Sequence, residues 1–252
     1  MRVTVLTGAD GAPFVRDLSD LLDEDDDLVV VAPVSRDSWA HGLKRCPDLD
    51  GLLAAFDDGA PETTAVTQRL ADFALFPATG SSGDREIAAQ LVRTELLQAG
   101  YGLGDVTTAM VTRLGLPLLL IPVSDDRVEQ HVVVGDDDGP RAVHVDDYLA
   151  SPTEASGVLL VADGWTASEP AVEAITTADV VVLGPTSPLL ALGPLLESPT
   201  VRHAVTQHPR LVRVEAAETA PRALAAVSPV DLPEATTVTS AAEAVAHARS
   251  RA

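Results

Sequence analysis

Acidic side chains gather in the segment that follows the second apolar run of the chain. Asp37, Asp48 and Asp50 all come soon after Leu28–Ala32. Carboxylate oxygens are the hard ligands that divalent cations prefer, so these side chains could share a cation if the fold brings them together. A simpler interpretation also fits, because Asp48 or Asp50 could cap the helix expected after them. The segment alone leaves a metal site and a helix cap equally open.

Glycine and hydroxyl residues mark two further loops. The segment Thr7-Gly-Ala-Asp-Gly-Ala-Pro13 leads from the first apolar run into a helical pattern, and Gly184-Pro-Thr-Ser-Pro188 follows Val180–Leu183. Backbone N–H groups at such a turn, helped by the dipole of the next helix, can bind a phosphate, and hydroxyl donors can assist them. An ordinary strand-to-helix turn explains the first loop as well, since the carboxylate of Asp10 would repel an anion.

Two more groups of polar residues lie at the ends of expected elements. Ser124, Asp125 and Asp126 come after an apolar run, where they could bind a ligand or form an ordinary turn. Asp84 and Arg85 open a long helical pattern. Asp84 is by default the cap of that helix, whereas Arg85 could bind a phosphate or a carboxylate in bidentate geometry. Neither group by itself identifies a ligand.

These loops separate strands and helices that alternate along the chain. Continuous β-branched runs predict strands that are buried on both faces. The expected strands are Val3–Leu6, Leu28–Ala32, Pro117–Ile121, Val158–Ala162, Val180–Leu183 and Leu211–Val214. Since helical patterns lie between most of them, the sequence predicts an α/β fold with a doubly wound, mostly parallel, Rossmann-like sheet. Ligands of such sheets bind beyond the carboxyl ends of the strands, where the loops described above are expected.

Helix boundaries and one hairpin can also be predicted. The expected helices are Asp84–Ala99, Val106–Leu114 and Ser168–Thr176. For the second of these, Asp105 is a suitable N-cap and Gly115 a suitable stop. The segments His131–Val134 and Arg141–Val145 predict a small antiparallel hairpin at one edge of the sheet.

The composition excludes several classes of function. The chain has 252 residues, which suits a single α/β domain over 1–252, and its formal net charge is −21. Nucleic acid is therefore not an expected partner, because binding to it depends on Lys and Arg side chains that neutralise phosphates. No apolar run reaches the ~20 residues that a membrane helix needs, and no signal-peptide pattern opens the sequence. Cys46 is the only cysteine, which excludes a disulfide within the chain. We expect an acidic cytoplasmic protein without a membrane partner.

The order of several short motifs resembles that of the 2-phospho-L-lactate transferase family, including its phosphoenolpyruvyl variant in bacteria. The resemblance runs in order from the first residue to about Val214, and the region 215–252 is shortened and divergent. The matching segments are Trp39, His41-Gly-Leu43, Cys46-Pro-Asp-Leu-Asp50, Gly83-Asp-Arg-Glu86, Arg93-Thr-Glu-Leu-Leu97, Ser124-Asp-Asp-Arg127, Gly184-Pro185, Pro188 and Gly193-Pro194.

The resemblance implies a reaction, a cofactor and roles for individual residues. The family joins a phospholactyl or enolpyruvyl phosphate group from a guanosine-diphosphate-linked donor to the hydroxyl of the deazaflavin Fo, releasing GMP, in coenzyme F-420 biosynthesis. It implies Mg²⁺ as cofactor and a homodimer. Carried over by position, Asp37 and Asp50 would hold the metal. The other implied roles are catalysis for Asp37, Asp84 and Arg85, acceptor binding for Trp39 and His41, and nucleotide or phosphate binding for Gly8, Gly11, Ser124, Asp125, Asp126, Gly184 and Thr186.

The sequence also departs from the family pattern. Where relatives carry Asn-Thr-x-Asp-Asp, this chain has Pro33-Val-Ser-Arg-Asp37, so that Arg36 replaces an acidic residue. A guanidinium there inverts the local charge and repels a cation. Ala9 stands in place of a glycine of the first loop, and Thr186-Ser187 in place of Ser-Asn. Two hypotheses follow: a divergent transferase, or a non-catalytic paralogue that binds nucleotide or deazaflavin, or that partners an active transferase.

Overall fold

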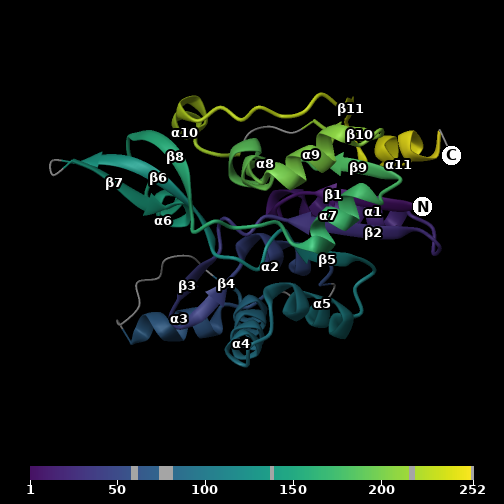
Figure 1. The fold of residues 1–252 in the computed structure, drawn as a ribbon. Coiled ribbons are helices and arrows are strands. Elements are labelled where there is room, and N and C mark those ends of the chain that lie inside the picture. Colours follow the sequence, from purple (N-terminus) through teal and green to yellow (C-terminus); the bar gives the residue numbers. More distant parts are fainter. Residues whose placement is uncertain (58–61, 74–81, 137–138, 216–218, 251–252) are drawn as a thin grey trace.

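A six-stranded parallel sheet forms the centre of the protein in a computed structural model, which describes residues 1–57, 62–73, 82–136, 139–215 and 219–250 (Figure 1). Its strands are β1 (Arg2–Leu6), β2 (Asp27–Ala32), β5 (Leu119–Pro122), β9 (Val180–Leu183), β10 (Leu211–Val214) and β11 (Thr236–Val238), in the order β11-β10-β9-β1-β2-β5. Every neighbouring pair in this sheet is parallel. The central strands β1, β2 and β9 are almost wholly buried, as their β-branched sequences predict.

Helices cover the sheet on both faces because the chain winds outward from β1 in two directions. It passes from β1 to β2 and β5, and later from β9 to β10 and β11, and right-handed connections in opposite directions place their helices on opposite faces. The helices are α1 (Ala12–Leu21), α2 (Pro47–Ala54), α3 (Ala65–Asp72), α4 (Asp84–Gln98), α5 (Leu103–Leu114), α6 (Val145–Ala150), α7 (Glu169–Thr176), α8 (Gly193–Glu197), α9 (Pro199–Gln207), α10 (Arg222–Val227) and α11 (Ala241–Arg249), with short helical turns η1 (Ala9–Gly11) and η2 (Pro188–Leu192). The doubly wound fold expected from the sequence is confirmed.

The expected helix boundaries hold with one correction. Helix α7 begins at the predicted cap, where Ser168 Oγ accepts a hydrogen bond from the backbone N–H of Ala171, and α5 ends at Gly115 in the left-handed conformation. The N-cap of α5 is Gly102 rather than Asp105, which lies in the first turn of the helix instead. A carboxylate is favourable there as well, because it faces the positive end of the helix dipole.

A second, antiparallel sheet contains the predicted hairpin. The hairpin strands β6 (Val128–Asp136) and β7 (Gly139–His144) pair as expected, with residues 137–138 of the turn outside the described residues. The third strand, β8 (Ala155–Ala162), contains the run Val158–Ala162, which the sequence placed in the parallel sheet. That placement was wrong because β8 only half-buries alternate residues, and Leu159 and Val161 face solvent.

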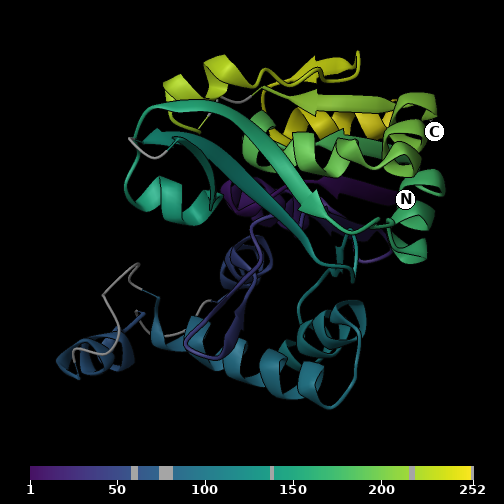
Figure 2. The same ribbon diagram turned by 60° about the vertical axis from the view of Figure 1, so that its left-hand side comes forward.

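The small sheet lies beyond the carboxyl ends of the parallel strands, on the side away from the N-terminus (Figures 1 and 2). Gln130 joins the two sheets, since its backbone N–H donates to Ser35 O at 2.7 Å and its side-chain amide to Leu189 O at 2.9 Å. A second hairpin, β3 (Ser38–Ala40) with β4 (Leu43–Arg45), also lies on this side. The small sheet therefore contacts the loops that follow β2 and β9. Among the described residues, no helix has the length and apolarity to cross a membrane.

Candidate functional site

The loops after β1 and β9 meet where the winding direction of the sheet reverses. The backbone N–H of Gly8 donates to Thr186 Oγ1 at 3.3 Å. A Cβ atom on Gly8 would lie 2.6 Å from Asp48 Oδ1, and one on Gly184 would lie 2.8 Å from Thr7 Cβ. Both positions therefore require glycine because of close approach. A reversal point of this kind is where open α/β sheets bind ligands. The structure brings the predicted residues Gly8, Gly184 and Thr186 together there, at a candidate phosphate site.

Asp48 fixes the loop after β1 by a hydrogen bond to its backbone. Its Oδ1 accepts a hydrogen bond from the backbone N–H of Ala9 at 2.9 Å, whereas its Oδ2 is buried without a hydrogen-bond partner among the described residues. The side chain is 3% exposed, and burial raises its pKa to about 6 in spite of the nearby Arg36. Asp48 does lie in the first turn of α2, where the sequence allowed a cap, but its carboxylate accepts a hydrogen bond from Ala9 of η1 and does not cap α2.

Arg36 lies between two carboxylates that come from distant parts of the chain. Its Nε donates to Asp146 Oδ1 at 2.9 Å, and its NH1 is 3.8 Å from Asp48 Oδ1, which is an ion pair without a hydrogen bond. Asp146 belongs to the first turn of α6 in the small sheet region, and its backbone N–H donates to the capping His144 Nδ1. The guanidinium therefore links the loop after β2 with both α2 and α6.

Asp37 follows Arg36 and forms a second cluster with the β3–β4 hairpin. Its Oδ2 accepts a hydrogen bond from Cys46 Sγ at 3.1 Å and lies 3.2 Å from Lys44 Nζ. Burial raises the pKa of Asp37 to about 6, an effect that the charge of Lys44 partly offsets. Burial and the neighbouring Asp37 raise the pKa of the Cys46 thiol as well, so this thiol remains protonated and acts as a donor.

Asp50 pairs with a buried arginine of α4. Both of its oxygens accept hydrogen bonds from the Arg93 guanidinium, and its Oδ2 also accepts from the backbone N–H of Cys46 at 3.3 Å. Arg93 is 1% exposed. Cys46 thus contacts both carboxylates predicted to hold Mg²⁺, Asp37 and Asp50, and each of the two faces a basic partner. In the described part of the chain, no three metal-ligating side chains of His, Cys, Asp or Glu gather in one place. This donor set does not fit a divalent cation held by Asp37 and Asp50.

The predicted residues after β5 hold neighbouring loops together. Ser124 Oγ donates to Thr166 O at 2.6 Å, Asp126 Oδ2 accepts from the backbone N–H of Thr166 at 2.9 Å, and Asp125 Oδ1 accepts from that of Gly104 at 2.7 Å. These hydrogen bonds fix the start of α5 and the loop before α7. Nucleotide binding by Ser124, Asp125 and Asp126 remains a prediction.

Asp84 and Arg85 lie at the start of α4 and contact the region around α3. Asp84 accepts hydrogen bonds from Thr63 Oγ1 and from the backbone N–H of Val66, and these contacts lower its pKa. The N-cap of α4 is Gly83, so Asp84 supports α3 rather than capping its own helix. Arg85 NH1 donates to Asp57 Oδ2 at 2.6 Å. These contacts join the start of α4 to the region around α3, and a catalytic role for either residue remains a prediction.

The predicted acceptor residues lie on the β3–β4 hairpin. Trp39 belongs to β3 and is 57% exposed, while His41 occupies the turn with a φ of 56° and is followed by Gly42 with a φ of 80°. The hairpin therefore presents an aromatic ring to solvent on the strand that directly follows Asp37. Gly11, at the other end of the first loop, allows the close approach of Thr7, since a Cβ there would meet Thr7 Oγ1.

Sequence reasoning missed three charged groups of this site. Lys44 had a signal, because it is the only lysine in the chain and follows the His41-Gly-Leu43 motif. Arg93 had one as well, since it opens the motif Arg93-Thr-Glu-Leu-Leu97. Asp146 had none, because only the placement of α6 against the loop after β2 brings it to Arg36.

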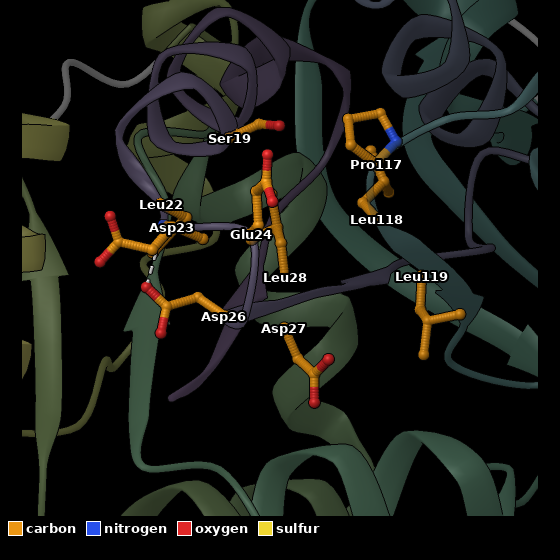
Figure 3. Close-up of a pocket in the computed structure, with 10 residues that line it drawn as sticks. All are labelled: Ser19, Leu22, Asp23, Glu24, Asp26, Asp27, Leu28, Pro117, Leu118 and Leu119. Carbon is orange, nitrogen blue, oxygen red and sulfur yellow. Dashed lines mark hydrogen bonds between the residues drawn. The ribbon is translucent and has the colours of Figure 1, made fainter.

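A shallow groove lies at the opposite edge of the sheet, where β2 and β5 begin (Figure 3). It has a volume of about 430 Å³ and is lined by Ser19, Leu22, Asp23, Glu24, Asp26, Asp27, Leu28, Pro117, Leu118 and Leu119. Asp23 and Asp26 are already paired with Arg249, and Asp26 also with the amino group of Met1. These acidic side chains therefore tie the chain ends together, and the groove contains none of the predicted site residues.

The fold and the site define a doubly wound α/β protein with a candidate phosphate site at the reversal point of its sheet. The model of the family described as "2-phospho-L-lactate transferase CofD" matches residues 3–224 of this chain. This match ends about ten residues after Val214, where the sequence analysis expected the resemblance to end. The chain belongs to this family of phosphoenolpyruvate and phospholactate transferases.

Several relatives carry the name phosphoenolpyruvate transferase. The chain is 35% identical over 223 residues to the one from Kitasatospora aureofaciens, covering 83% of this chain and 70% of that protein. It is 36% identical over 221 residues to that of Streptomyces griseus, covering 82% and 69%, and 34% identical over 235 residues to that of Mycobacterium tuberculosis, covering 82% and 71%. A crystal structure of a UPF0052-family protein from Bacillus halodurans matches with a TM-score of 0.61 at 18% identity, covering 84% of this chain and 68% of that chain. This last likeness supports the fold alone.

Proposed function

We propose that this chain transfers a phospholactyl or enolpyruvyl phosphate group from a guanosine-diphosphate-linked donor to the hydroxyl of the deazaflavin Fo. The single observation that carries the proposal is the junction of the Gly8 and Thr186 loops at the reversal point of the sheet, in a chain of the transferase family. Such a junction offers backbone and hydroxyl groups to a diphosphate.

The proposed reaction exchanges one phosphorus–oxygen bond for another. The oxygen of the acceptor hydroxyl attacks the phosphorus that carries the lactyl or enolpyruvyl group. The bond from this phosphorus to the bridging oxygen breaks, that oxygen leaves with GMP, and the acceptor hydroxyl loses its proton. Positioning of the acceptor in line and stabilisation of the phosphate charge are the contributions expected of the protein.

We assign to Asp37 the role of the general base that accepts the proton of the acceptor hydroxyl. A general base works best when its pKa lies near the working pH, and burial raises the pKa of this carboxyl to about 6. Asp37 also directly precedes the strand that carries the exposed Trp39. An exposed indole offers a flat apolar face on which the deazaflavin ring can stack.

A transfer assay tests this function. The purified protein is incubated with the guanosine-diphosphate-linked donor and Fo, with and without Mg²⁺, and the release of GMP and the new deazaflavin product are followed by chromatography and mass spectrometry. The Gly8→Ala variant should lose transfer, because its Cβ would collide with Asp48 Oδ1. Gly157→Ala is the matched control, since a Cβ there meets nothing within 4 Å. Absence of product with every donor would refute the proposal.

A second candidate is a non-catalytic relative that binds the nucleotide or the deazaflavin, or pairs with an active transferase. The engagement of Asp37 by Lys44 and of Asp50 by Arg93 favours it, because both carboxylates implied in metal binding face basic groups. Calorimetric binding of GDP or Fo by a protein that forms no product in the transfer assay would support this candidate over the enzyme.

A further inference from the structure

We propose that Arg36 and Lys44 take the place of a divalent cation, so that this chain binds a nucleoside diphosphate without metal. The inference rests on the nucleotide site of the proposed function and concerns how that site meets the charge of the diphosphate.

Basic side chains already engage the two carboxylates that would bind a cation. Asp50 directs both oxygens to Arg93, and its side chain is 5% exposed. Asp37 directs Oδ2 to the Lys44 ammonium and the Cys46 thiol. Mg²⁺ requires oxygen ligands in near-octahedral geometry and retains several waters. To bind it, the protein would have to break two buried ion pairs.

Arg36 has donors to spare for a phosphate. Only its Nε makes a hydrogen bond within the described residues, to Asp146, whereas NH1 remains 3.8 Å from Asp48 Oδ1. The side chain is 20% exposed. A guanidinium presents five N–H donors in a planar fork that matches two phosphate oxygens, and the terminal nitrogens of Arg36 keep most of that fork available.

The position of Arg36 suits a diphosphate bound at the Gly8 loop. Asp48, its neighbour, holds the backbone N–H of Ala9, the residue that follows Gly8. Gly8 in turn contacts Thr186 of the loop after β9. One chain of contacts therefore runs from the guanidinium to the reversal point of the sheet.

Lys44 is a second positive group on the segment that follows β2: its Nζ lies 3.2 Å from Asp37 Oδ2, and its side chain is 16% exposed. A lysine ammonium is a compact point charge that commonly binds phosphate.

Calorimetric titration of the full chain with GDP, in EDTA and again in excess Mg²⁺, tests the inference. The expected dissociation constants agree within about twofold in the two buffers, since fixed side chains supply the charge. Arg36→Asp should weaken binding by about tenfold or more in both buffers, because Asp37 and Asp50 keep their basic partners in this variant. Arg69→Gln, at an exposed arginine of α3, and Arg36→Gln form a matched pair in which only the second should lose affinity.

A second measurement reports on the metal directly. Electron paramagnetic resonance of Mn²⁺ mixed with the nucleotide-free protein should show only free Mn²⁺, because Lys44 and Arg93 occupy the two carboxylates that would hold the ion, and a bound Mn²⁺ signal would contradict the inference. Circular dichroism melting verifies that each variant folds. Binding of GDP by the natural chain at least about tenfold tighter in Mg²⁺ than in EDTA overturns the inference alone. Absence of GDP binding in both buffers overturns the nucleotide site of the proposed function together with it.

Discussion

The Oδ1 atom of Asp48 lies 2.9 Å from the backbone nitrogen of Ala9, so the first turn of α2 holds the loop that follows β1. The other oxygen of this carboxyl is buried without a hydrogen-bond partner among the described residues. A buried carboxylate oxygen of this kind costs folding free energy when the group is ionised. Asp48 therefore holds the loop in place but lowers the free energy of unfolding when it is ionised, so its effect on stability depends on pH.

We expect Asp48→Asn to stabilise the protein at neutral pH. Burial raises the pKa of Asp48 from 3.8 to about 6. Between these two values the unfolded chain releases the proton while the folded chain keeps it, so the free energy of unfolding falls as the pH rises through this window. A shift of this size corresponds to up to about 3 kcal/mol. The asparagine keeps an oxygen for Ala9 without the charge.

Urea unfolding at several pH values provides the measurement. The stability gain of Asp48→Asn over the natural chain should be small at about pH 4 and should reach its plateau above about pH 6. Asp25→Asn, at an exposed position before β2, is the control and should follow the natural profile. An Asp48→Asn gain that does not change with pH would contradict the raised pKa.

Arg93→Met should destabilise the protein strongly. The substitution leaves the Asp50 carboxylate buried without its partner, which typically costs about 3–5 kcal/mol. The double variant Arg93→Met with Asp50→Leu should recover most of the loss, because two apolar side chains replace the whole ion pair. The exposed Arg69→Met should change the free energy of unfolding by no more than about 0.5 kcal/mol. Equal losses at positions 69 and 93 in urea unfolding would argue against the buried pair.

The sequence predicted the fold better than the pairing of charges. Five of the six strands of the parallel sheet were recognisable because runs such as Leu28–Ala32 are apolar on both faces, whereas the short β11 (Thr236–Val238), with two of its three residues exposed, was not predicted. The run Val158–Ala162 was wrongly placed in the parallel sheet, because its apolar composition does not indicate that Leu159 and Val161 point to solvent. The loops of Gly8 and Thr186 were expected at one edge, because parallel strands end together.

The partners of the acidic residues were beyond local sequence reasoning. Arg93 reaches Asp50 across a sequence separation of 43 residues, and Asp146 reaches Arg36 across 110. Neither distance leaves a periodic pattern in the sequence. The sequence left a shared cation and a helix cap equally open for these acidic residues, and the family resemblance implied a metal held by Asp37 and Asp50, whereas tertiary packing gives each of these two a basic neighbour.

Transfer activity should fall as the pH decreases through about 6. Asp37 must be deprotonated to accept the proton of the acceptor hydroxyl, and its pKa is about 6. Asp37→Asn should lower kcat much more than the affinity for GDP measured by calorimetry. Because Asp48 has a similar pKa, the profile of Asp48→Asn serves as the control and should keep the acidic limb. A rate that stays constant from about pH 5 to pH 8 would exclude Asp37 as the base.

Asp146→Asn should strengthen binding of GDP, because Asp146 competes with a phosphate for Arg36. The Arg36 Nε–Asp146 Oδ1 distance of 2.9 Å marks a charge-assisted hydrogen bond, and both side chains are partly exposed, at 20% and 17%. Ion pairs at such positions contribute about 0.2–1 kcal/mol, so the affinity should rise by up to about fivefold. Asparagine keeps the oxygen that Arg36 Nε contacts, which limits any change in the placement of α6.

Asp147→Asn is the neighbouring control and should leave the affinity unchanged. The two dissociation constants are measured by calorimetry at equal salt concentration, and a weaker affinity in Asp146→Asn would show that Asp146 positions Arg36 for the phosphate rather than competing with it.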